Sequence, residues 1–285
     1  SGLNHYMGIA ISAFVATMLA WASTLLPAGW TSTPWHPLLA CALFIVPGVP
    51  LINFVDDMLD NYIQVGIVRA VNTLLMVAAM AFGIAFAVKL CSIGDFFPTI
   101  SMVPHHNYLE YAIAAAISAM GFSMIFNIQR RLLWVVAIGG IIAVCTRNFV
   151  NLGPSTNNIG LDMGLVIGSF SGSVLVSLIA IKAVHWFHVP NHVLTIPSVI
   201  PMIPGVLMYR MLFGLINMNV QSIDQVTPLM KAMESGVNSG LIIMCIALGV
   251  AIPNIFGRRF IAASKNKRLA AILKERRARG KFVEW

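Results

Sequence analysis

The sequence predicts an all-α polytopic membrane protein with about eight transmembrane helices, drawn from a five-plus-five inverted repeat with Pro-Gly-broken helices. Of its 285 residues, 58% are hydrophobic and only 10% are charged, with a mean hydropathy of +0.84. Soluble domains are about a quarter charged. The apolar segments are also long enough to cross a bilayer, which takes about 20 residues each. Finally, two of these segments contain a Pro-Gly pair, which breaks a helix.

The chain divides into apolar segments separated by polar or Pro/Gly-rich stretches. We expect residues 1–98 to hold the last three helices of the first repeat half, residues 99–256 the complete second half, and residues 257–285 a basic tail. Because the chain starts at Ser1 without methionine, we expect a fragment or processed product that lacks the first two helices. The expected segments are 5–26, 36–55, 66–89, 108–126, 131–149, 161–184, 192–214 and 228–253.

The net positive charge lies in the C-terminal tail. Residues 257–285 contain ten Lys/Arg and two Glu, whereas the remainder has eight basic and eight acidic residues. A polybasic segment after a last membrane helix is typical of the cytoplasmic side and of an anionic lipid surface. We therefore expect a multi-pass protein with a cytoplasmic C-terminus and membrane lipids, not nucleic acid, as its partners.

The repeat is clearest at the two Pro-Gly pairs. Residues 45–50 (IVPGVP) return as residues 202–207 (MIPGVL), so that Pro47-Gly48 corresponds to Pro204-Gly205 at an offset of 157. Flanking matches fall at offsets of 156 and 166. Equivalent segments are five apart, an odd number, so they must cross the membrane in opposite directions. The flanking matches are Gly8 with Gly164, Asn72 with Asn238 and Gly83 with Gly249.

The broken helices are the first candidate site. A break frees backbone amides and carbonyls, which the membrane tolerates only inside protein or beside a water-filled cavity. Paired breaks at matching positions of a repeat mark the substrate sites of transporters. We therefore expect Pro47, Gly48, Pro204 and Gly205 to meet in the bilayer interior and to line the substrate site.

Acidic residues follow the first break. Carboxylates near the membrane core are costly and usually functional. Asn53 and Asp57 share a helix face, and Asp56 lies about 100° away from Asp57. One of these carboxylates could carry a proton or bind a substrate ammonium group. The alternative is that Asp56, Asp57 and Asp60 are simply solvated among the inner lipid headgroups.

Basic and amide side chains complete the candidate set. Arg147 and Arg210, with Tyr209 beside the latter, could bind a carboxylate, because guanidinium offers a bidentate fork. The alternative is that these arginines extend to the membrane interface. Asn72 and Asn238 occupy equivalent helices, where they could line a polar site or join helices by hydrogen bonds. Arg69 and Glu234, one turn before these asparagines, are expected to pair with charges across the repeat interface.

Other chemistry is not indicated. Pro190 disrupts the helical spacing of His188 and His192, and neither Cys nor carboxylate completes a metal set. Adjacent residues such as Asp56 and Asp57 point apart, unlike the facing carboxyls of an aspartic protease. The sequence has no nucleotide-binding loop or nucleophile elbow. We expect no metal, no cofactor and no enzymatic activity.

At these residues the sequence resembles the threonine/serine exporter family of bacterial inner-membrane proteins. The resemblance covers most of residues 5–256. It rests on Val46–Asn53 with Asp57, Gly66–Arg69, Gly121–Asn127, Arg147, and Val199–Val206 with Tyr209.

The resemblance implies ten helices, a soluble cytoplasmic region before the first helix, and efflux of small hydroxy amino acids driven by the proton motive force. A two-protein form of the family is linked to succinate export, and this chain resembles the fused form. The hypothesis is a proton-coupled secondary exporter of threonine or serine in the bacterial inner membrane, and a homo-oligomer is compatible with it. A C4-dicarboxylate (succinate) exporter is one alternative, and a passive channel or scaffold subunit is another.

Overall fold

Every regular element of the described chain is a helix. The computed structural model describes residues 4–24, 47–91, 107–154, 159–187, 189–216 and 226–278. Within these ranges six helices are long and apolar enough to cross a bilayer, which confirms the predicted all-α polytopic membrane fold. They belong to α1 (His5–Thr24), α4 (Ile63–Leu90), α5 (Tyr108–Ile125), α6 (Leu133–Asn151, preceded by the turn η1, Arg130–Leu132), α7 (Leu165–Phe187) and α10 (Val226–Ala278).

The two segments that carry Pro-Gly contain only short helices. In the first, α3 (Gly48–Leu59) begins directly after Pro47, and residues 36–46 lie outside the described part. In the second, the helix stops at Ile203, whose backbone is extended, because proline disfavours a helical residue before it. This segment consists of α8 (Asn191–Val199), the 3-10 turn η2 (Ile200–Met202) and α9 (Gly205–Ile216).

The short helices after the two breaks correspond closely. Both α3 and α9 have 12 residues, which is about 18 Å and roughly half of a bilayer core. Their first turns close with equivalent hydrogen bonds, from Leu51 N–H to the Pro47 carbonyl (3.1 Å) and from Met208 N–H to the Pro204 carbonyl (3.2 Å). Each helix therefore starts at its Pro-Gly pair.

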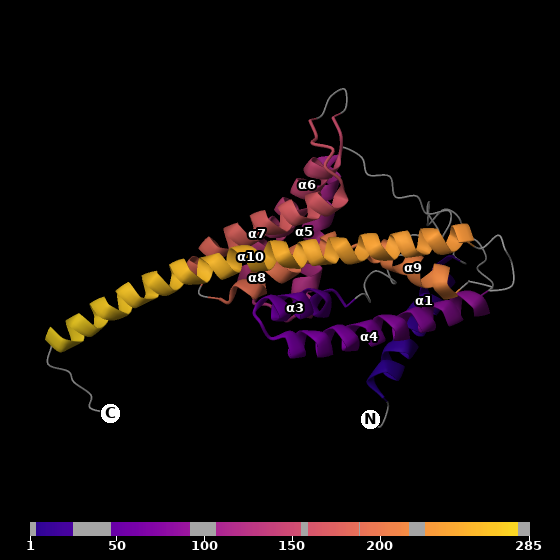
Figure 1. Ribbon diagram of the computed structural model, residues 1–285, viewed down its shortest axis with the longest axis horizontal. Helices are drawn as coiled ribbons and strands as arrows, with labels where there is room; N and C mark the ends of the chain where they lie inside the picture. Colours follow the sequence, from indigo (N-terminus) through magenta and orange to yellow (C-terminus); the bar gives the residue numbers. More distant parts are fainter. Residues whose placement is uncertain are drawn as a thin grey trace.

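The long helices repeat the same pairings. α1 and α3 pack against α4, and α7 and α9 pack against α10. Gly83 of α4 lies against the Ala10 carbonyl of α1, and the equivalent Gly249 of α10 lies against Phe170 and Ser173 of α7. In Figure 1, the chain runs in opposite directions along α4 and α10. Opposite directions are what an inverted repeat requires.

The remaining helices pack around α6. α6 packs against α5, α7 and α8. Added Cβ atoms at Gly168 and Gly172 of α7 would lie 2.6 Å from the Arg147 carbonyl oxygen and 2.5 Å from the Ala143 carbonyl oxygen of α6. At these positions only glycine permits the approach of the two backbones.

The C-terminal region is more regular than the sequence predicts. We expected the last membrane helix to end near residue 253, with a separate tail from residue 257. Instead, α10 continues without interruption to Ala278, although Pro253 lies within it. Its yellow end projects beyond the other helices in Figure 1. At 53 residues, α10 is about 80 Å long.

Candidate functional site

The two Pro-Gly breaks lie against each other. A Cβ atom added to Gly48 would sit 2.6 Å from Cδ1 of Ile203 and 3.6 Å from Cγ1 of Ile200. Gly48 and Gly205 are buried, while Pro47 and Pro204 are partly exposed. Val49 and Ile52 of α3 share a core cluster with Ile203 and Met202. The structure thus places the first Pro-Gly pair against the residues that directly precede the second.

The segments around the breaks run antiparallel. Gly48 contacts Ile200, and the Asp56 carboxylate lies 3.8 Å from Nε2 of His192. Eight residues separate the first contact from the second on each segment (48 to 56, and 200 to 192). α3 therefore leads away from the break alongside the α8 segment that leads into it.

The second break offers partial charges of both signs. The carbonyl end of η2 at Met202 is followed within three residues by the amide end of α9 at Gly205. Helix carbonyl ends attract cations, and helix amide ends attract anions. The amide end of α3 begins at Gly48, beside the same break. A small zwitterion could meet complementary charges here.

Arg147 supplies a full positive charge at this position. It extends from α6, and its Nη1 donates to the Met202 carbonyl at 3.3 Å. Its Nε is buried and has no hydrogen-bond partner among the described residues. Tyr111 of α5 lies close enough to interact electrostatically with the guanidinium. A guanidinium held by one carbonyl keeps donors available for a carboxylate.

Asp57 and Asp56 face different helices, as their spacing predicts. Asp57 accepts a 2.5 Å hydrogen bond from Nη1 of Arg69 on α4, and about half of the Arg69 side chain is exposed. We expected Arg69 to pair across the repeat interface, but this bond is to the carboxylate twelve residues before it in the same half. Asn53 is half-buried on α3, one turn before Asp57.

The remaining candidates lie on α4, α9 and α10. Asn72 of α4 accepts a 2.6 Å hydrogen bond from the Tyr6 hydroxyl of α1, so it joins two helices. Arg210 of α9 and Asn238 of α10 are partly buried. Tyr209 lies in α9, but its side chain is outside the described part.

Three polar residues near Asp56 were not among the candidates. His192 approaches Asp56 itself, and Asn191 Nδ2 donates to Oδ1 of the buried Asn254 on α10. From the sequence, His192 was weighed as a metal ligand, and no contact with Asp56 was predicted. Its contact depends on the alignment of two distant segments, which no local spacing reveals.

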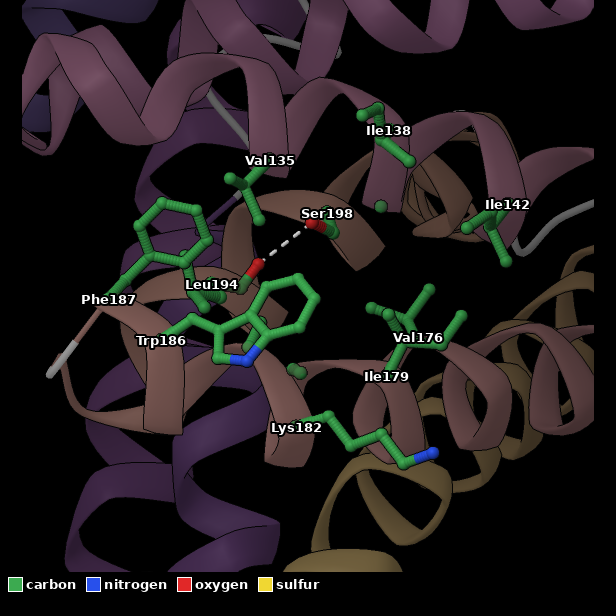
Figure 2. Close-up of a pocket in the computed structure, with 13 residues that line it drawn as sticks. Val135, Ile138, Ile142, Val176, Ile179, Lys182, Trp186, Phe187, Leu194 and Ser198 are labelled. Carbon is green, nitrogen blue, oxygen red and sulfur yellow. Dashed lines mark hydrogen bonds between the residues drawn. The ribbon is translucent and has the colours of Figure 1, made fainter.

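A pocket of about 450 Å³ lies elsewhere, between α6, α7 and α8. Figure 2 shows its apolar lining, with Trp186 and Phe187 from α7 and Ile138 and Ile142 from α6. The Ser198 hydroxyl in its wall already donates to the Leu194 carbonyl at 2.8 Å. No candidate residue lines it, and Lys182 is the one charged side chain among its described lining residues.

The chain matches two family models. Residues 111–256 match the model described as "Threonine/Serine exporter, ThrE", and residues 1–91 match a second model of a threonine/serine exporter. No solved structure matches the chain. The matches cover both broken segments and Arg147, and they support an exporter role for this multi-pass membrane protein. The chain belongs to the threonine/serine exporter family.

Proposed function

We propose that the chain exports threonine or serine across the bacterial inner membrane in exchange for protons, with its C-terminus in the cytoplasm. The observation that carries this proposal is the position of Arg147. Its guanidinium contacts Met202 at the second break, and the first break packs against the next residue, Ile203. A substrate carboxylate placed there would bind a full positive charge and the amide ends of α3 and α9.

The same break favours an amino acid over a dicarboxylate. An α-amino acid carries its carboxylate and its ammonium group on one carbon atom, so both charges need partners close together. The carbonyl end of η2 and the amide end of α9 provide such neighbours. A dicarboxylate has two negative groups and would place one of them near carbonyl oxygens. Asp56 lies eight residues, or about 12 Å, beyond Gly48 along α3, too far to hold that ammonium group.

The test is counterflow of labelled threonine into proteoliposomes that contain the full chain. Arg147→Gln should weaken threonine binding by more than about tenfold, because truncating one partner of a buried charge pair costs about 2–5 kcal/mol. Arg147→Lys should recover only part of this loss, because lysine lacks the bidentate fork. The matched control is Arg130→Gln, which removes an exposed arginine of η1.

The competing functions give different results in this assay. Threonine counterflow that saturates and is inhibited by serine but not by succinate supports the proposal. Inhibition by succinate alone would indicate a dicarboxylate carrier. Flux that rises linearly with concentration, without counterflow, would indicate a channel, and no flux of any of the three compounds would indicate a scaffold.

A further inference from the structure

Polar side chains from three helices meet eight residues away from the breaks. Asp56 belongs to α3, Asn191 and His192 begin α8, and Asn254 lies near the end of the apolar part of α10. The Asp56 carboxylate and the His192 imidazole are 3.8 Å apart, and Asn191 is hydrogen-bonded to Asn254. The Asp56 side chain is 20% exposed and that of His192 is 40% exposed. The pair is therefore anchored between helices but accessible to water.

We propose that His192 and Asp56 form the proton-binding site that couples transport to the pH gradient. Histidine is the side chain that gains and loses a proton near neutral pH. Protonated His192 attracts the Asp56 carboxylate, and this attraction disappears when the proton leaves. The inference rests on the proposed exporter function and names the residues that would make it proton-driven.

The pair is placed to transmit this change to the substrate site. α3 starts at the first break and α8 leads, through η2, into the second. Asp56 and His192 thus hold together the two segments whose other ends meet at Gly48 and Ile200. Loss of the proton frees these segments to separate about 12 Å from the substrate. Coupling then acts through helix movement and needs no contact between proton site and substrate.

Other charged side chains lie on the same helices and on those packed against them. On α3 itself, Asp57 is bound by Arg69 of α4, and Asp60 follows the helix. α8 carries no charged residue other than His192 between Asn191 and Val199. The remaining described charged side chains of the packing helices are Glu110 on α5, Arg147 on α6, Lys182 on α7, Lys89 on α4, and Lys231 and Glu234 on α10.

The location fits an exporter that exchanges substrate for protons. Asn254 lies three residues before Gly257, where the basic region of α10 begins. If that region is cytoplasmic, the pair lies toward the cytoplasmic end of the transport path. A proton that enters from outside would be released there, on the same side on which the substrate is taken up.

The decisive variant is His192→Gln, with His5→Gln as a matched control at an exposed histidine of α1. Both are reconstituted as the full chain in proteoliposomes. Threonine counterflow at equal pH measures substrate exchange, and threonine transport under an imposed pH gradient, with a pH dye in the lumen, measures coupling. We expect His192→Gln to retain counterflow and to lose both the stimulation by the gradient and the dye signal. His5→Gln should retain all three.

Each other result is informative. A His192→Gln protein with undiminished gradient-driven transport overturns the inference. A folded His192→Gln protein that loses counterflow as well also overturns it, because His192 would then act on the substrate path. Asp56→Asn provides an independent check and should also lose the response to the gradient. If the unmodified chain moves neither threonine nor serine, the proposed function itself fails.

Discussion

Gly83→Ala tests whether the contact between α1 and α4 is as close as the structure shows. The new methyl group would meet the Ala10 carbonyl oxygen, with the carbonyl carbon at 3.0 Å and Cβ of Ala13 at 3.2 Å. These atoms belong to a helix backbone or lie close to it, so α1 must move away from α4. Overpacking of this kind costs about 1–3 kcal/mol, and such a close approach suggests about 3.

The intrinsic preference of alanine for helices acts in the opposite direction. Alanine is favoured over glycine by about 1 kcal/mol in a helix, so we expect Gly83→Ala to destabilise the protein by about 2 kcal/mol. Gly240→Ala on α10 is the control, because nothing lies within 4 Å of its added Cβ. It should be stabilising by up to about 1 kcal/mol.

The measurement is reversible unfolding of the detergent-solubilised chain, followed by circular dichroism. Gly249→Ala extends the test to the second half, where the new methyl would meet the Ser173 hydroxyl and the Phe170 carbonyl oxygen (2.9 Å). The reasoning would be refuted if Gly83→Ala and Gly249→Ala were as stable as Gly240→Ala. The loss at Gly249 should be the smaller of the two, because its nearest contact is a serine hydroxyl that can rotate, whereas that of Gly83 is a backbone carbonyl.

Two further predictions concern polar contacts of α4. Tyr6→Phe removes the donor to Asn72 and should cost about 0.6–1 kcal/mol in the same unfolding assay. Additive effects of Tyr6→Phe and Asn72→Ala would contradict this hydrogen bond. Asp57→Asn should cost less than about 1 kcal/mol, because its partner Arg69 is half exposed and screened by solvent. Gradient-driven threonine transport should survive it, and a loss of the gradient response would assign coupling to Asp57 instead.

The sequence predicts well those features that follow from local backbone chemistry. Proline removes a backbone donor and disfavours the interior of a helix, and the Pro-Gly pairs at Pro47 and Pro204 predict the helix ends found there, although α10 continues through Pro253. The repetition of the pair led us to expect that the two segments meet. The placement of Asp56 and Asp57 on different faces of α3 follows in the same way from the helical period.

Features that depend on long-range alignment are not predictable in this way. The contact of His192 with Asp56 joins segments 136 residues apart (192 minus 56). It exists because the two segments run antiparallel from one shared point. Arg69 shows the opposite case, since its partner is close in the chain but is selected by the turn between α3 and α4. The sequence does not specify that turn's geometry.

The repeat also shows where its two halves have diverged. At the offset of 157 that relates the Pro-Gly pairs, Asp56 corresponds to Phe213 and His192 to Trp35. In the sequence, the positions equivalent to the titratable pair are therefore occupied by aromatic residues, which do not bind protons. A symmetric carrier would bind protons equally well from both faces, and the pH gradient alone would set its direction. Because the sequence does not repeat the proposed proton-binding pair at the equivalent positions, the proposal predicts a carrier whose two open states differ in their response to pH. Such a carrier would have two halves that share a backbone arrangement but differ in their charged side chains.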